Sequence, residues 1–64
     1  MGLFFRKNRV LIQVQDINGN WLTLNTIDDD SGQYVTQRML ESQNQSPTGR
    51  VRAMYEGGGL IDVR

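Results

Sequence analysis

Two stretches of this chain alternate between apolar and polar residues, and a glycine-containing turn interrupts each of them. Alternation with a period of two is typical of a strand that buries one of its faces. The first stretch covers residues 9–15 and 21–26, and the second covers residues 50–55 and 60–63. Each stretch therefore predicts a β-hairpin, and the two hairpins with their turns use about half of the 64 residues.

The turn of the first hairpin decides how its strands pair. A two-residue loop on the Asn-Gly pair would point the apolar groups of the two strands to opposite faces. A three-residue loop, with Gly19 as the left-handed residue of a bulge, brings these groups to one face instead. We favour the second register, because turn chemistry and burial then agree. Its apolar pairs are Val14 with Leu22 and Ile12 with Leu24.

The segment between the hairpins has helical spacing. Asp30, followed three residues later by Gln33, has the form of a capping box and predicts a helix over about residues 31–44. Strong breakers at residues 46–49 end this segment. The helix carries a narrow apolar stripe, which consists of Val35, Met39 and Leu40.

The second hairpin completes the predicted fold. Pairing Ala53 with Ile61 sets Arg52 opposite Asp62 and Met54 opposite Leu60, whereas a slip of two residues would face two arginines. A helix between two hairpins is a right-handed crossover that places the third strand beside the first. We expect one small α+β domain over residues 1–64, with the element order ββαββ. It contains a four-stranded antiparallel sheet of order 2-1-3-4 and one helix packed on one face.

Strict alternation assigns each strand residue to one of the two faces of this sheet. The face toward the helix is expected to hold Val10, Ile12, Val14, Leu22, Leu24, Val51, Ala53, Tyr55, Ile61 and Val63. No second helix is expected to cover the other face, and large apolar, aromatic and cationic groups of this kind are enriched in protein interfaces. Its candidate partner-binding residues are Leu11, Trp21, Arg50, Arg52, Met54 and Leu60. We interpret this face as a surface for protein–protein interaction or homodimerisation.

Two other interpretations of this face remain open. Its apolar groups can be singly exposed residues of an ordinary surface. Alternatively, the sheet can bind single-stranded nucleic acid, with a base stacked on Trp21 and the phosphates near Arg50 and Arg52. One aromatic residue on an edge strand is few for such a platform, and the formal net charge of zero gives no general attraction to a polyanion. Nucleic acid is therefore the alternative partner.

The composition argues against catalysis and cofactor binding. The chain has no histidine and no cysteine, so it lacks the usual neutral-pH base, disulfides and thiolate metal ligands. The acidic run at residues 28–30 is expected to flank the helix N-terminus, and the glycines at 57–59 are expected to form a hairpin tip. We expect no enzymatic activity, no cofactor, no metal site and no small-molecule substrate.

The first residues carry a short apolar run, Leu3, Phe4 and Phe5. This run is too short for the apolar part of a signal peptide or for a membrane span, so we expect a cytoplasmic protein with no membrane partner. The run either extends the core beneath the helix or contacts a partner. Because a domain of this size has a thin core, a second copy of the chain is also a candidate partner.

Overall fold

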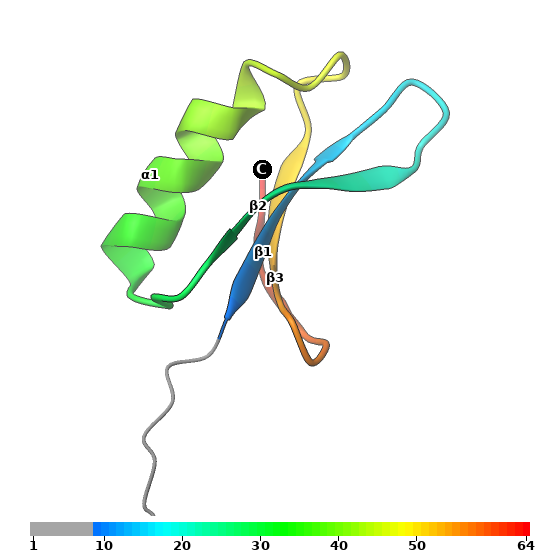
Figure 1. Ribbon diagram of the computed structural model, residues 1–64. Coiled ribbons are helices and arrows are strands. Elements are labelled where there is room, and N and C mark those ends of the chain that lie inside the picture. Colours follow the sequence, from blue (N-terminus) through cyan, green and yellow to red (C-terminus); the bar gives the residue numbers. More distant parts are fainter. Residues whose placement is uncertain (1–8) are drawn as a thin grey trace, which may run out of the picture.

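The computed structural model describes residues 9–64, which form two hairpins joined by one helix (Figure 1). The elements in chain order are β1 (Val10–Gln15), β2 (Trp21–Ile27), α1 (Gly32–Gln43), β3 (Val51–Tyr55) and β4 (Leu60–Val63). All neighbouring strands are antiparallel, and the sheet order is β2-β1-β3-β4. The predicted ββαββ fold, with its strand order and its helix on one face, is confirmed. The roles predicted for Leu3, Phe4 and Phe5 concern residues outside this described range.

The core lies between α1 and the two central strands. The helix contacts β1 and β3 and lies on one side of the sheet (Figure 1). Alternate residues of β1 are buried, as expected for a strand with one face in the core. The buried apolar residues are Val10, Ile12, Val14, Ile27, Val35, Met39, Val51 and Ala53.

The predicted three-residue turn between β1 and β2 is confirmed. Gly19 has a φ of +88° and donates its N–H to the carbonyl oxygen of Asp16 at 3.1 Å. The Asp16 carboxylate accepts two further backbone N–H groups of the turn, each at 2.9 Å. These contacts fix the start of the ladder, in which Val14 pairs with Leu22 as predicted.

Each outer strand contains a β-bulge, and the two bulges lie in the same row of the sheet. In β2 the extra residue is Leu24, between the partners of Gln13 and Ile12, and in β4 it is Ile61, between the partners of Met54 and Ala53. Ile12 and Ala53 are themselves cross-strand partners in the central pair. An extra residue on one strand increases the local twist, so both edges of the sheet turn at the level where the helix packs.

The bulge in β2 makes part of the predicted register wrong. Asn25, and not Leu24, is the partner of Ile12. Beyond the bulge the alternation resumes with the opposite parity, and Ile27 is only 6% exposed. A strict alternation has no place for the extra residue, and for this reason the sequence pattern did not identify Ile27 as a core residue.

The bulge in β4 shifts the predicted pairs in the same way. Met54 lies opposite Leu60 as predicted, but Arg52 lies opposite Val63 and not opposite Asp62. Val63 therefore shares a face with Arg52, on the side away from the helix. Its assignment to the helix side was wrong.

The helix begins beside an acidic turn. Its N-cap is Ser31 and not Asp30, and no side chain caps it with a hydrogen bond, so the predicted capping box is wrong. The Asp29 carboxylate accepts the N–H of Ser31 at 2.9 Å. Two buried residues of the predicted stripe, Val35 and Met39, face the sheet.

One helix does not cover the whole inner face. Leu22 and Leu24 of β2 lie on the helix side, yet they are 50% and 37% exposed. Leu40 of the predicted stripe is also about half exposed. Tyr55 and Ile61 pack against the core and are partly buried. The core is therefore built on β1 and β3, and the helix side of β2 remains accessible.

Candidate interaction face

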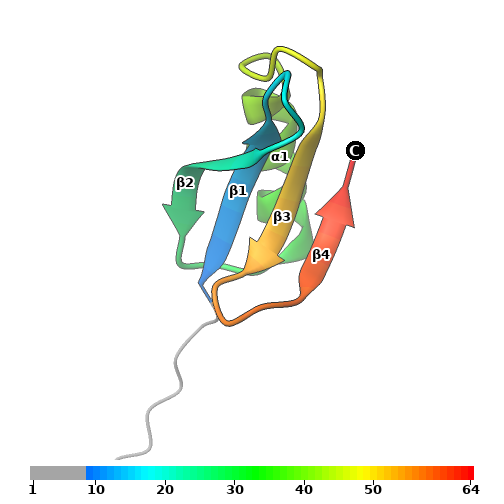
Figure 2. The same cartoon turned by 90° about the vertical axis from the view of Figure 1, so that its right-hand side faces the viewer.

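The side of the sheet away from α1 is here called the uncovered face, since no helix of residues 9–64 packs on it. Figure 2 looks onto this face, with the helix behind the strands. Residues that are directly opposite in neighbouring strands point to the same face, so the register arranges the side chains in rows across the sheet. Three such rows define the chemistry of the uncovered face.

The middle row is apolar and joins three residues that the sequence assigned to the site. Leu11 of β1 lies opposite Met54 of β3, and Met54 lies opposite Leu60 of β4. Leu11 and Met54 are half-buried, whereas Leu60 is 56% exposed. We call these three residues the apolar row. Val63, which is 40% exposed, adds apolar surface beside it on β4.

A polar row borders the apolar row toward the β1–β2 turn. Arg52 donates from Nε to Oε1 of Gln13 at 2.8 Å, and Gln13 donates from Nε2 to Oγ1 of Thr23 at 2.9 Å. The Arg52 guanidinium also lies 4.3 Å from the centre of the Trp21 ring. The structure thus brings two predicted site residues, Trp21 and Arg52, into contact with each other. This cation–π contact covers one face of the indole.

An ionic row borders the apolar row on its other side. Arg9 lies between two carboxylates, with Nε 3.2 Å from Oδ1 of Asp28 and Nη1 3.4 Å from Oε2 of Glu56. All three side chains are about half exposed or more, so each pair stabilises the fold by at most about 1 kcal/mol. The apolar row is therefore bordered on this side by charged groups that are already paired with each other.

Arg50, the remaining predicted site residue, lies apart from the apolar row. Its backbone is held by the loop after α1, because its N–H donates to Oγ of Ser46 at 3.2 Å and to Oγ1 of Thr48 at 3.3 Å. Its guanidinium has no acidic or aromatic partner within residues 9–64. The other arginines of this range, each with such a partner, are Arg9, Arg38, Arg52 and Arg64.

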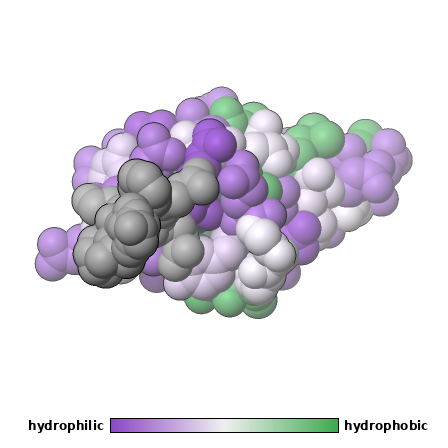
Figure 3. Space-filling view, turned by 60° about the horizontal axis from the view of Figure 1, so that its bottom comes forward, coloured by the Kyte–Doolittle hydropathy of each residue, from purple (hydrophilic) through white to green (hydrophobic). Residues whose placement is uncertain are grey.

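The surface shows the same separation of apolar and polar groups. Seen from the end of the molecule where β1 begins, hydrophobic residues form separate patches between hydrophilic ones (Figure 3). Apolar surface is therefore not spread evenly over the molecule.

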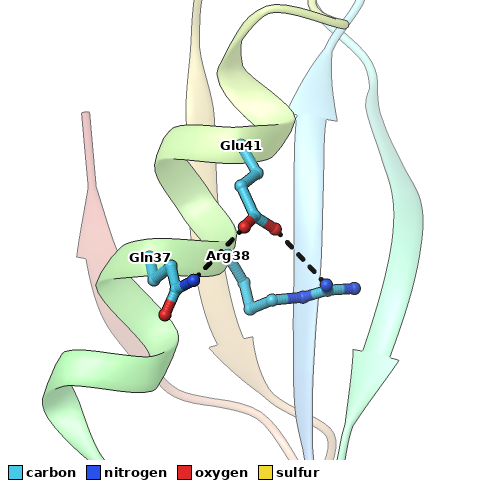
Figure 4. A network of polar contacts seen from close by, with 3 residues as sticks. All are labelled: Gln37, Arg38 and Glu41. Atoms are coloured by element: carbon cyan, nitrogen blue, oxygen red, sulfur yellow. Dashed lines mark hydrogen bonds and ion pairs between the residues drawn. The ribbon is translucent and has the colours of Figure 1, made fainter.

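A polar cluster on the helix was not identified from the sequence. Nη1 of Arg38 lies 3.3 Å from Oε1 of Glu41, and Nε2 of Gln37 lies 3.4 Å from Oε2 of the same carboxylate (Figure 4). Arg38 lies on the β2 side of α1 and lines a shallow polar depression with residues 26–29. Its Nε is buried and has no hydrogen-bond partner in the described part of the chain. A charged cluster thus occupies the position from which apolar side chains could have extended the core over β2.

Two negative findings concern the described residues. Within residues 9–64, no three His, Cys, Asp or Glu side chains are grouped so that they could hold a metal ion. No helix in this range has the length and apolarity that a membrane crossing requires.

Similarity to known proteins adds nothing to this geometry. No protein family model, no curated protein and no solved structure matches the chain. A function can therefore be proposed only from the side chains described above.

Proposed function

We propose that the chain is a small, non-enzymatic cytoplasmic module that binds a protein, either another chain or a second copy, through the uncovered face. The observation that carries this proposal is the apolar row of Leu11, Met54 and Leu60. Polar rows whose groups are already paired border it on both sides. An apolar centre inside a polar rim is the usual anatomy of a protein interface.

The size of the face sets the strength of the expected contact. A sheet of four strands is about 19 Å wide, and five residues span about 17 Å, so the projected area is roughly 300 Å². A stable protein–protein interface buries about 800 Å² on each partner. We therefore propose a weak, exchanging contact for a single uncovered face.

The residues of the face differ in what they offer a partner. Leu60 is the most exposed member of the apolar row, and the flexible thioether of Met54 adapts to irregular partner surfaces. Trp21 already has one ring face against Arg52. We expect Leu60 and Met54 to contribute most of the binding and Trp21 to shape the rim.

A nucleic-acid-binding function has weaker support. Contacts with the phosphate backbone need cations that are free to pair with it. Arg52 is engaged with Trp21 and Gln13, and Arg9 lies between two carboxylates. A base that stacked on the covered side of Trp21 would first have to displace Arg52. Among the cations that residues 9–64 place on this face, Arg50 alone has no acidic or aromatic partner.

The direct test compares two leucines of similar exposure on opposite sides of the molecule. Leu60→Asp places a charge in the apolar row, and Leu40→Asp places the same charge on the helix, where the side chain is also about half exposed. Self-association is measured by sedimentation, and binding of other proteins by crosslinked pull-down compared between the variants. We expect Leu60→Asp to lose the contact and Leu40→Asp to keep it. Equal capture of other proteins by both variants, together with self-association that Leu60→Asp does not weaken, contradicts the proposal.

The nucleic-acid alternative has its own measurement. Single-stranded oligonucleotides are titrated at low salt while the fluorescence of Trp21 is recorded. Quenching that weakens with added salt and disappears in Arg50→Ser would favour nucleic acid over a protein partner.

A further inference from the structure

The two edges of the sheet differ in how their backbone is protected. On β4, the Asp62 carboxylate accepts the N–H of Val63 at 2.9 Å and the Nε of Arg64 at 3.1 Å. This strand is four residues long and contains a bulge. A short, bulged edge with charged groups on it is poorly suited to pairing with a further strand.

The β2 edge also contains a bulge, at Leu24, but it is longer than the β4 edge and carries no charged side chain. Its seven residues include no charged residue, no proline and no glycine. Most of them are exposed, and two are leucines that the helix leaves uncovered. A long uncharged edge strand of this composition is the kind that pairs with another strand.

The backbone of β2 presents hydrogen-bonding groups at this edge. Gln15 donates its N–H to the carbonyl oxygen of Arg50. The backbone of Gln15 therefore bonds on the β3 side and not to its β2 partner, Trp21. Hydrogen-bonded and non-hydrogen-bonded pairs alternate along an antiparallel ladder. Gln15 with Trp21 is a non-hydrogen-bonded pair, so the pair two residues along, Gln13 with Thr23, is non-hydrogen-bonded as well. The N–H and C=O groups of Trp21 and Thr23 therefore point away from the sheet.

We propose that β2 pairs antiparallel with β2 of a second copy, around a two-fold axis at Thr23. In this register Thr23 lies opposite Thr23 of the second copy, and Leu22 of each copy lies opposite Leu24 of the other. The strand is its own complement, because the two leucines lie on the same side of the sheet at equal distances from Thr23. Since β2 is uncharged, two copies meet without repulsion.

Pairing with a second copy would enlarge the uncovered face. A two-fold axis perpendicular to the sheet places both helices on one side and both uncovered faces on the other. The projected uncovered face grows from roughly 300 to roughly 600 Å², which approaches the area that a stable interface needs on each partner. The pairing enlarges the proposed binding face but does not rest on that function.

The bulge limits how far the strands can pair. The regular part of β2 before the bulge ends at Thr23, so few backbone hydrogen bonds join the copies. Cross-strand side-chain pairs add about 0.2–1 kcal/mol each. We therefore expect a weak dimer that exchanges with monomer at micromolar or higher concentrations.

A disulfide test examines the register directly, because the chain has no cysteine of its own. Thr23→Cys places two thiols on residues whose Cα atoms are about 5.5 Å apart in the proposed dimer, within the range that a disulfide spans. Thr26→Cys is the matched control, since it is an exposed threonine on the same strand and the same face, far from its symmetry mate. Under mild oxidation, Thr23→Cys should form the linked dimer many times faster than Thr26→Cys. Equal rates would overturn the proposal.

The second test follows the mass of the native chain over a range of concentrations by sedimentation equilibrium. Leu22→Lys should raise the dissociation constant of the dimer about tenfold, which corresponds to about 1.4 kcal/mol, whereas Leu60→Lys should leave it unchanged. Circular dichroism verifies that each variant is folded.

The outcomes separate the edge from the uncovered face. A wild-type chain that stays monomeric to millimolar concentration overturns the proposal. This holds even if Leu22→Lys no longer captures a different protein, because that loss would assign β2 to another partner and not to a second copy. Dissociation by Leu60→Lys alone overturns it as well and assigns the second copy to the uncovered face. An intact dimer in Leu60→Lys, combined with lost capture of another protein, supports both proposals. If Leu60→Lys loses capture of another protein and the wild-type chain forms no dimer, the result supports only the function proposed above.

Discussion

The two hairpins share one plan but end their outer strands differently. Each has a central strand in the core and an outer strand bulged at the same row, yet β2 is seven residues long and uncharged, whereas β4 is four residues long and closes with a carboxylate. The buried Ile27 anchors the end of β2, and the Asp62–Arg64 pair stands at the end of β4. The difference indicates that the two edges are not equally suited to pairing with a further strand.

Burial differs between the strands because of the width of a helix. A helix with its side chains is about 10 Å across, and strands are spaced about 4.8 Å apart, so one helix covers about two strands. α1 uses this width on β1 and β3. The outer strands are then stabilised mainly by their ladders and by a few side chains that reach the core.

The largest expected effect tests this division between central and outer strands. Ile12→Ala removes a fully buried side chain from β1 and should lower the free energy of unfolding by about 2–5 kcal/mol. Leu22→Ala removes a half-exposed side chain from β2, and its cost should stay below about 1 kcal/mol. Urea denaturation measures both values. Similar losses would mean that the outer strand belongs to the core.

The two hairpin turns offer the next contrast. Gly19→Ala forces a side chain into the left-handed conformation and should lower the free energy of unfolding by about 1–2 kcal/mol. The matched change Gly57→Ala, in the other turn, meets no atom within 4 Å and needs no positive φ, so stability should hardly change. Thermal unfolding followed by circular dichroism compares them. An equal fall in Tm would show that the left-handed conformation at Gly19 is not what makes this position sensitive.

Asp62→Ala sharpens the contrast between the edges. Loss of the two hydrogen bonds of its half-exposed carboxylate should reduce the free energy of unfolding by about 1 kcal/mol or less. In a Leu22→Lys background, in which pairing at β2 is suppressed, the same change should increase self-association through β4. Sedimentation at several concentrations detects this increase. An unchanged mass would mean that strand length and the bulge protect this edge without the carboxylate.

The smallest effect concerns the polar row. Arg52→Met removes the cation over Trp21 and should reduce stability by about 0.5–1 kcal/mol while shifting Trp21 emission to longer wavelength. Arg50→Met removes a cation without an aromatic partner and should leave the emission unchanged. Identical spectra for both variants would contradict a persistent contact between Arg52 and Trp21.

The architecture was predictable because the central strands follow strict alternation and because one turn has unambiguous chemistry. Asp16 and Gly19 favour a single loop type, and this loop fixes the pairing of Val14 with Leu22. The bulge at Leu24 was not predictable in this way, because a strand pattern does not show where an extra residue is inserted. Ile27 was missed for the same reason.

The candidate site was predictable only where it depends on backbone register. The alignment of Leu11, Met54 and Leu60 in one row follows from the order of the strands and the turn geometry. The contact of Arg52 with Trp21 crosses β1 diagonally and depends on the conformation of a long side chain, which alternation does not encode. Two of the six residues expected on the binding surface, Trp21 and Arg52, are therefore engaged with each other.

The aligned bulges have a consequence for how this sheet tolerates changes in length. Leu24 and Ile61 are surplus to the pairing of their strands, since every other residue would keep its partner if either one were deleted. A deletion elsewhere in the same strands would turn all residues beyond it to the opposite side. Natural variants of this fold should therefore gain or lose single residues at these two positions more readily than at their neighbours.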